Sequence, residues 1–154
     1  MGQVPSTDMR IALASDHAGF EMKEHLAKWL TESGHAVYDL GTHSSDPVDY
    51  PDYAAAAGRA VLDGRANRAV VVCGSGAGAC VAANKLNGIR AALAHDTYTA
   101  AQMVEHDDVN LLCLGSRVIG VMLAESVVGA FLAASFSGEE RHRRRLEKVK
   151  ALES

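Results

Sequence analysis

The stretch that decides the fold is Ala69-Val70-Val71-Val72-Cys73-Gly74-Ser75-Gly76-Ala77-Gly78, which leads into a helix-compatible segment at 79–86. An apolar run, a glycine loop and a helix, in this order, are typical of a strand whose carboxyl end opens onto a ligand. The three glycines let the backbone bend sharply and approach a ligand closely, while the first N–H groups of the helix point at it. This arrangement suits the binding of a phosphate or an oxyanion intermediate, and the Cys73 thiol lies at the start of the loop.

Two well-known glycine motifs are excluded. The loop does not end in Gly-Lys-Ser/Thr, so it is not a nucleoside-triphosphate P-loop. Nor does it lie in the first strand–helix unit with an acid about 20 residues further on, the arrangement that a dinucleotide site would require. The alternative that Cys73 is only a small core residue stays open on this pattern alone.

Composition limits the domain count and the class of protein. With 154 residues, 48% of them hydrophobic, the chain can bury one core, so we expect a single domain over residues 9–154. A net charge of -4 argues against general nucleic-acid binding. No apolar run approaches the roughly 18 residues of a membrane span and no signal-peptide core is present, so we predict no membrane partner and a cytoplasmic location. Three cysteines without Cys-x-x-Cys spacing indicate neither a disulfide framework nor a zinc site.

Residues 1–8 are predicted to form a disordered leader, native or added for expression, before a start near Met9. Residues 1–6 formally fit the myristoylation pattern, but that pattern is short and nothing else in the chain favours a membrane.

Short apolar runs alternate with longer amphipathic segments along the rest of the chain. The runs predict strands at 10–15, 36–40, 69–72, 91–94 and 111–114. Helical spacing predicts a first helix through Met22, Leu26 and Leu30, ended by Gly34, and further helices at 52–62, 79–86, 97–105, 120–134 and 138–152. Near-continuous apolar strands separated by helices indicate an α/β fold: a three-layer α/β/α sandwich with a five-stranded parallel, Rossmann-like sheet and an extended C-terminal helix.

Ligands of such sheets bind outside the carboxyl ends of the strands. That rule brings together three segments that are far apart in sequence: Asp16-His17, the loop at 73–78, and Gly115-Ser116-Arg117. We therefore expect the functional site at this edge.

A basic cluster, Arg141-His142-Arg143-Arg144-Arg145, lies in the last predicted helix. Arg141 and Arg145 are four residues apart, so they share one helix face and could clamp a phosphate. The alternative is a solvated basic face that pairs with Glu139, Glu140 and Glu147.

Together these residues resemble the ribose-5-phosphate isomerase B / galactose-6-phosphate isomerase family of sugar-phosphate isomerases. The resemblance runs from Met9 to Glu153. Its motifs are Ser15-Asp16-His17-Ala18-Gly19-Phe20, Asp49-Tyr50-Pro51, the glycine loop at 73–78, Ala82-Ala83-Asn84-Lys85, Gly88-Ile89-Arg90-Ala91, Glu105-His106, Gly115-Ser116-Arg117, and the arginines Arg141 and Arg145.

The resemblance implies a reversible 1,2-proton shift between an aldose phosphate and its 2-ketose through a cis-enediol, with no metal and no cofactor. Cys73 would be the general base, and the positive end of the following helix favours its thiolate form. The amides of Gly74, Ser75, Gly76, Ala77 and Gly78 would hold the enediolate oxygen. Some members use a glutamate six residues after this cysteine, but here that position is Ala79.

The resemblance also assigns the remaining site residues. His106 would protonate the ring oxygen of the furanose form, although a histidine beside Glu105, Asp107 and Asp108 could instead be an ordinary exposed residue. Asp16 would hold substrate hydroxyls or assist ring opening, and the Ser75 hydroxyl would help. The implied substrate contacts are Tyr50 and, for the phosphate, His17, Arg117, Arg141 and Arg145.

Sites in this family are shared across a homodimer, which implies at least a homodimer here and allows a tetramer, with the C-terminal helix against the neighbour. One position departs from the family, which usually has asparagine after the catalytic histidine where this chain has Asp107. A carboxylate accepts hydrogen bonds but donates none, so the substrate stays open among ribose 5-phosphate, allose 6-phosphate, galactose 6-phosphate and a four-carbon ketose phosphate. A non-catalytic phosphate-binding or regulatory subunit is the alternative from another class.

Overall fold

The computed structural model describes residues 9–153, so the predicted leader at 1–8 lies outside the described part of the chain. The strands are β1 (Arg10–Ser15), β2 (Ala36–Asp39), β3 (Arg68–Cys73), β4 (Ala91–Leu93) and β5 (Leu111–Gly115). The helices are α1 (Phe20–Glu32), α2 (Tyr50–Leu62), α3 (Ala77–Ala83), α4 (Thr97–Asp107), α5 (Val121–Ala133) and α6 (Glu140–Lys150). Between residues 9 and 153, no helix is long and apolar enough to cross a membrane.

The strands form one five-stranded sheet in the order β2-β1-β3-β5-β4, and every pairing is parallel. The central strands β1, β3 and β5 are almost entirely buried, which explains why their sequences are continuous apolar runs. Each predicted strand is found within one or two residues of its expected bounds. The predicted parallel sheet is therefore confirmed.

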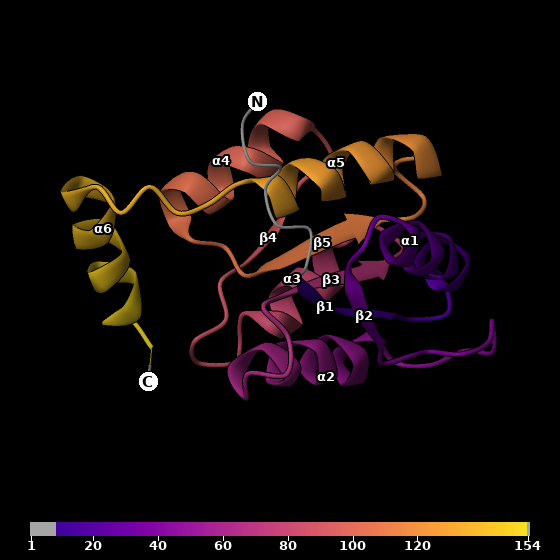
Figure 1. Cartoon of the computed structure of the whole chain (residues 1–154). Helices are drawn as coiled ribbons and strands as arrows, with labels where there is room; N and C mark the ends of the chain where they lie inside the picture. Colours follow the sequence, from indigo (N-terminus) through magenta and orange to yellow (C-terminus); the bar gives the residue numbers. More distant parts are fainter. Residues whose placement is uncertain (1–8, 154) are drawn as a thin grey trace, which may run out of the picture.

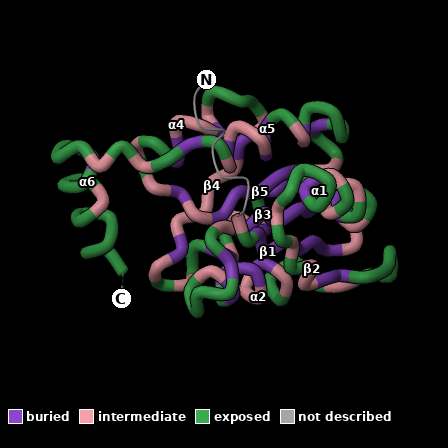
Figure 2. Tube along the Cα trace, viewed as in Figure 1, coloured by how far each residue is buried: buried purple, intermediate pink, exposed green. Residues whose placement is uncertain are grey.

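Side chains that alternate along each strand pack into two separate cores. Val70 and Val72 of β3 point into the core beneath α1, α4 and α5, whereas Val71 and Cys73 point into the core beneath α2 and α3. Figure 1 shows the sheet between these two helix layers, and Figure 2 shows the buried residues concentrated along the strands. The structure is thus the predicted three-layer sandwich.

Helix α6 is present as predicted but is shorter than the expected segment at 138–152. It stands apart from the sandwich in Figure 1, and most of its residues are exposed in Figure 2. Because only one residue of α6 is buried, this helix adds little to the core formed by the other elements.

Helices α2 and α3 each begin two residues earlier than predicted. Gly76, with a φ of 84°, turns the chain directly into α3, so Gly78 belongs to the first helical turn rather than to a loop. Helix α3 also ends earlier than predicted, since the amide side chain of Asn84 bonds both the N–H and the carbonyl of Ala91. Helix α2 begins at Tyr50 because Asp49 is extended and Pro51 suits a first helical turn.

The end of β5 packs directly on the loop that follows β3. A Cβ at Gly115 would lie 2.6 Å from both the carbonyl carbon and the carbonyl oxygen of Ser75. The N–H of Ser116 donates to the Cys73 carbonyl at 2.8 Å, and the N–H of Arg117 donates to the Gly74 carbonyl at 3.0 Å. Backbone contacts therefore hold the loop after β3 against the end of β5.

Replacing Gly115 with alanine should lower the free energy of unfolding by about 1–3 kcal/mol, because backbone rather than a flexible side chain must move. The control is Gly129→Ala within α5, where the new Cβ meets only the Trp29 ring at 3.8 Å. That variant should be unchanged or more stable, since alanine favours a helix interior over glycine. Urea unfolding followed by circular dichroism measures both, and equal losses would contradict the close approach.

Candidate active site

A hollow of about 340 Å³ opens at the carboxyl edge of the sheet, beside the ends of β1, β3 and β5. Its lining residues are Asp16, Tyr50, Cys73, Gly74, Ser75, Gly78, Arg117 and Val118. Every one of them except Val118 was predicted from the sequence to belong to the site. The rule that ligands bind at the carboxyl edge of a parallel sheet therefore located the hollow correctly.

Cys73 is the last residue of β3 and is only 5% exposed. The backbone N–H of Gly76 donates a hydrogen bond to its sulfur across 3.2 Å. This hydrogen bond fixes the position of the sulfur beside the loop. The loop geometry thus provides a thiol at the edge of the hollow in a setting that suits a base.

The glycine loop lies between an aromatic ring and a guanidinium group. A Cβ at Gly78 would lie 2.7 Å from the Tyr50 ring, and a Cβ at Gly74 would lie 3.3 Å from Nη1 of Arg117. The N–H of Gly78 is in the first turn of α3, where helix geometry supplies no carbonyl partner. The hollow therefore offers a backbone donor on the glycine loop and a cation, Arg117 after β5, packed against that loop.

Two polar side chains follow β1. Asp16 is 8% exposed, and its Oδ1 accepts the N–H of Gly19 at 3.1 Å. The Nδ1 of His17 lies 3.1 Å from the backbone nitrogen of Val48 and 3.2 Å from its oxygen. When Nδ1 accepts the Val48 N–H, the ring proton must be on Nε2, which is then available to donate to an anion.

His17, Gly76 and Ala77 are predicted site residues that adjoin lining residues in the sequence but do not line the hollow themselves. Four further predicted site residues are not brought to this hollow within one copy of the chain. Helix α4 starts after the carboxyl end of β4 and runs back toward the opposite edge, so His106 and Asp107 in its last turn lie at the amino edge. Arg141 and Arg145 belong to α6, outside the sandwich. Arg141 forms an ion pair with Glu139 at 2.6 Å, as the alternative of a solvated basic face predicted.

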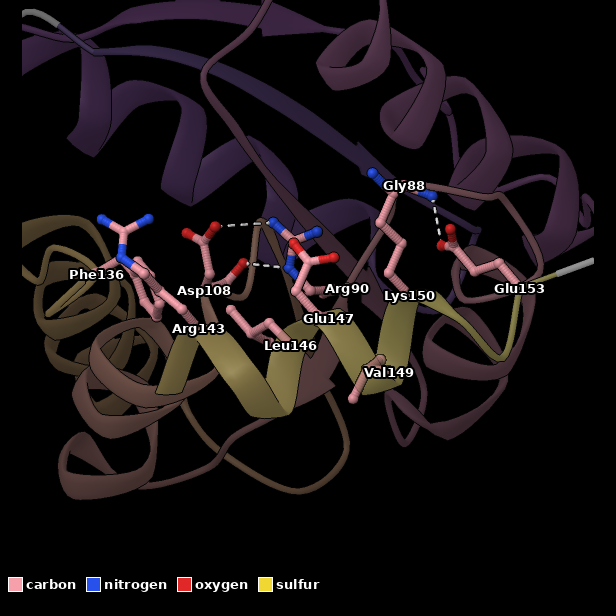
Figure 3. A pocket seen from close by; sticks show the side chains of 10 residues that line it. All are labelled: Gly88, Arg90, Asp108, Phe136, Arg143, Leu146, Glu147, Val149, Lys150 and Glu153. Atoms are coloured by element: carbon pink, nitrogen blue, oxygen red, sulfur yellow. Dashed lines mark hydrogen bonds and ion pairs between the residues drawn. The ribbon is translucent and has the colours of Figure 1, made fainter. Parts of the chain in front are cut away.

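The amino edge has hollows of its own, and one is drawn in Figure 3. It measures about 400 Å³ and lies between α6 and the segment around Arg90. Arg90 donates to the Asp108 carboxylate at 3.1 Å and to its carbonyl at 2.7 Å, while Glu153 accepts the N–H of Gly88 at 2.7 Å. A neighbouring hollow of about 560 Å³ is lined in part by Asp107.

Three contacts near these sites were not predicted from the sequence. The buried His142 ring stacks on His106 with 4.2 Å between ring centroids. The Nε2 of His95 accepts the N–H of Gly115 at 2.9 Å, which helps to fix the end of β5. His95 could have been noticed as a polar residue just past a strand end, like Asp16, whereas no spacing in the sequence pairs His142 with His106.

The third contact joins the two cysteines to which the sequence analysis assigned no role. Cys80 and Cys113 lie in the same core as Cys73, and all three thiols are free. A hydrogen bond with Cys113 lowers the pKa of Cys80 to about 7, whereas that same bond, burial and the neighbouring thiols raise the pKa of Cys113. Among the described residues, no group of three or more His, Cys, Asp or Glu side chains is arranged to hold a metal ion.

Comparison with known proteins gives a consistent result. Residues 11–149 match the family model described as Ribose/Galactose Isomerase. Over 144 residues the chain is 42% identical to ribose-5-phosphate isomerase B of Escherichia coli (strain K12), covering 94% of this chain and 96% of that protein. Over 134 residues it is 40% identical to D-erythrulose-4-phosphate isomerase of Pectobacterium atrosepticum, covering 84% and 86% respectively.

A solved structure agrees with these sequence matches. The ribose-5-phosphate isomerase B of Clostridium thermocellum superposes with a TM-score of 0.91 at 42% identity, covering 94% of this chain and 97% of that one. The similarity therefore extends over both edges of the sheet and includes α6. On the strength of the family match and of relatives that align over nearly their whole length, the chain belongs to the ribose/galactose isomerase family.

Proposed function

We propose that this protein interconverts ribose 5-phosphate and ribulose 5-phosphate through a cis-enediol intermediate. The observation that carries the proposal is the Cys73 thiol at the carboxyl-edge hollow, with an amide N–H directed at its sulfur, in a ribose/galactose isomerase. The relatives named ribose-5-phosphate isomerase B support this choice of substrate.

The Cys73 thiolate removes the proton from C2 of the open-chain aldose. The electron pair left at C2 forms the C1=C2 double bond, and O1 gains the negative charge of an enediolate. The thiol then delivers the proton to C1, the hydroxyl proton of O2 moves to O1, and the ketose results. Loop amides such as that of Gly78 hold the charged oxygen, which lowers the barrier without a change in oxidation state of the protein.

Other residues of the hollow orient the sugar. Asp16 accepts hydrogen bonds from sugar hydroxyls through its carboxylate, and Ser75 and Tyr50 contribute hydroxyl groups beside the loop. Ala79, at the position where some family members have a glutamate, is fully buried and carries no titratable group. Proton transfer therefore rests on Cys73.

Ring opening requires an acid that one copy of the chain does not bring to the hollow. His106 lies at the amino edge and Cys73 at the carboxyl edge, which favours a homodimer with shared sites, alone or within a tetramer. In each site, Cys73 of one subunit would work with His106 of the partner subunit. Arg141 and Arg145 of the partner subunit would then join Arg117 and His17 around the phosphate.

D-erythrulose 4-phosphate is a second candidate substrate, and a specific observation favours it. The chain is 40% identical to a D-erythrulose-4-phosphate isomerase, and it carries Asp107 beside the ring-opening histidine. A carboxylate there accepts hydrogen bonds from hydroxyls but repels an enediolate or a phosphate. Comparing kcat/KM across five-carbon, six-carbon and four-carbon sugar phosphates decides between the substrates.

Cys73→Ala should abolish isomerisation while sugar-phosphate binding survives, because a positioned general base contributes about 10² to 10⁴ in rate. The measurement is NMR of ribose 5-phosphate in deuterated water, which detects both ribulose 5-phosphate and deuterium at carbon. Cys80→Ala is the matched control, since Cys80 does not line the hollow.

Near-native turnover by Cys73→Ala would place the base elsewhere. Tight binding of ribose 5-phosphate to the unmodified protein, without ketose and without deuterium at carbon, would instead establish the non-catalytic binding module. Calorimetric titration of both proteins measures the binding.

His106→Ala should slow turnover of cyclic ribose 5-phosphate far more than that of ribulose 5-phosphate, which is already open-chain. Single-turnover measurements in both directions reveal the difference. His25→Ala, which removes a histidine paired with Glu125 between α1 and α5, is the control. Equal losses in the two directions would show that His106 has no dedicated role in ring opening.

A further inference from the structure

Helix α6 is positioned by a single buried side chain. His142 is 3% exposed and is the one buried residue among Glu140–Lys150. Hollows separate much of the rest of the helix from the sandwich, as Figure 3 shows for its middle turns, until Glu153 reaches the backbone of Gly88. The placement of α6 therefore depends on the contacts of His142.

Those contacts all lead back to the end of α4. The His142 ring stacks on the His106 ring, with centroids 4.2 Å apart and an angle of 26° between planes. The Nδ1 of His142 lies 2.6 Å from the hydroxyl of Ser137, whose backbone N–H donates to the Glu105 carbonyl at 2.9 Å. We call Glu105, His106, Ser137 and His142 the histidine clasp.

We propose that His142 is a positioning residue: through the histidine clasp it holds the His106 imidazole and fixes Arg141 and Arg145 relative to it. The proposal rests on the proposed function, in which His106 opens the sugar ring. Stacking restricts rotation of His106, while the Ser137 hydroxyl fixes the orientation of the second ring. The acid and the phosphate-binding arginines are thereby presented to a site as one unit.

The protonation state of His142 agrees with this role. Burial lowers the pKa of His142, the positive charges of His106, Arg141 and Arg145 act in the same direction, and Glu139 opposes them. The His142 ring is therefore neutral at neutral pH, so the proposed ring-opening acid does not face a cation across the stack. Protonating both rings would place two like charges 4.2 Å apart.

Acid should consequently weaken the clasp. Since the folded protein holds His142 at a lowered pKa, the unfolded chain takes up this proton at higher pH than the folded chain. The contribution of His142 to stability is complete above about pH 6.5 and is lost as the pH falls below that value. In His142→Phe, this part of the acid sensitivity should disappear from urea unfolding curves.

The deciding experiment compares His142→Ala with His142→Phe in the full-length protein. The first variant removes the stacked ring, whereas the second keeps an aromatic ring there and loses only the bond to Ser137. The Cε1 proton resonance of His106, which the neighbouring ring current displaces, should move in His142→Ala and stay close to its original position in His142→Phe. His25→Phe, on α1, controls for loss of a histidine elsewhere.

Kinetics supply the second readout. His142→Ala should lower kcat for ribose 5-phosphate about 2- to 12-fold, the worth of one aromatic stack, with a smaller loss for ribulose 5-phosphate. His142→Phe should restore most of that loss. Made in a His106→Ala background, His142→Ala should change kcat little further, because the two rings act as one unit.

An unmoved His106 resonance in His142→Ala, or a loss of kcat that is equal in both directions and persists in the His106→Ala background, would overturn the proposal. The resonance is observed without substrate, so it reports on the clasp even if the protein fails to isomerise ribose 5-phosphate. Failure to isomerise would remove the proposed function, whereas an unmoved resonance would remove the role of His142 alone.

Discussion

Backbone packs directly on backbone where β5 meets the loop after β3, and the carboxyl-edge hollow depends on this contact. No side chain fits between Gly115 and Ser75, and two carbonyls of the loop are bound by the N–H groups of Ser116 and Arg117. With the loop fixed in this way, Gly76 can turn into α3 while its N–H remains directed at the Cys73 sulfur. The role proposed for Cys73, a base that returns the proton it removes, requires a rigid setting of this kind.

The parallel sheet also divides the candidate chemistry between two edges. Residues that follow strands, such as Asp16 and Cys73, collect at the carboxyl edge, while His106 ends a helix that runs the other way. In the proposed mechanism, a single copy therefore presents the base without the ring-opening acid at one edge, and the acid without the base at the other. The proposed association of two copies would bring the two groups together, and α6, which stands apart from the sandwich, carries the arginines proposed to reach the neighbour.

Much of the fold was predictable because the decisive signals are local. Buried strands such as that ending at Cys73 are continuous apolar runs, and glycine at 76 marks a turn that needs a positive φ. Helix ends were less predictable, since α3 stops where Asn84 bonds the backbone of Ala91, a contact formed only by folding. Most of the hollow followed from one topological rule applied to the strand ends.

Contacts between elements could not be predicted either, because they too form only on folding. His142 belongs to a basic run that looks solvated in sequence, and only the packing of α6 against α4 shows that its ring is buried on His106. Likewise, the hydrogen bond between Cys80 and Cys113 joins α3 to β5, and nothing in the spacing of these cysteines indicates it. Periodicity identifies which face of an element is apolar, but not which partner that face meets.

The most direct test of the account is complementation between two inactive variants. Cys73→Ala and His106→Ala proteins are mixed under conditions that allow subunit exchange, and ribose 5-phosphate isomerisation is followed as hybrids form, with native mass spectrometry counting them. If each site uses Cys73 of one subunit and His106 of the partner subunit, each hybrid dimer contains one intact site of two. In an equal mixture about half of the dimers are hybrids, so the mixture should regain about a quarter of the activity of the unmodified protein. Hybrids that form in full and remain inactive would contradict the account.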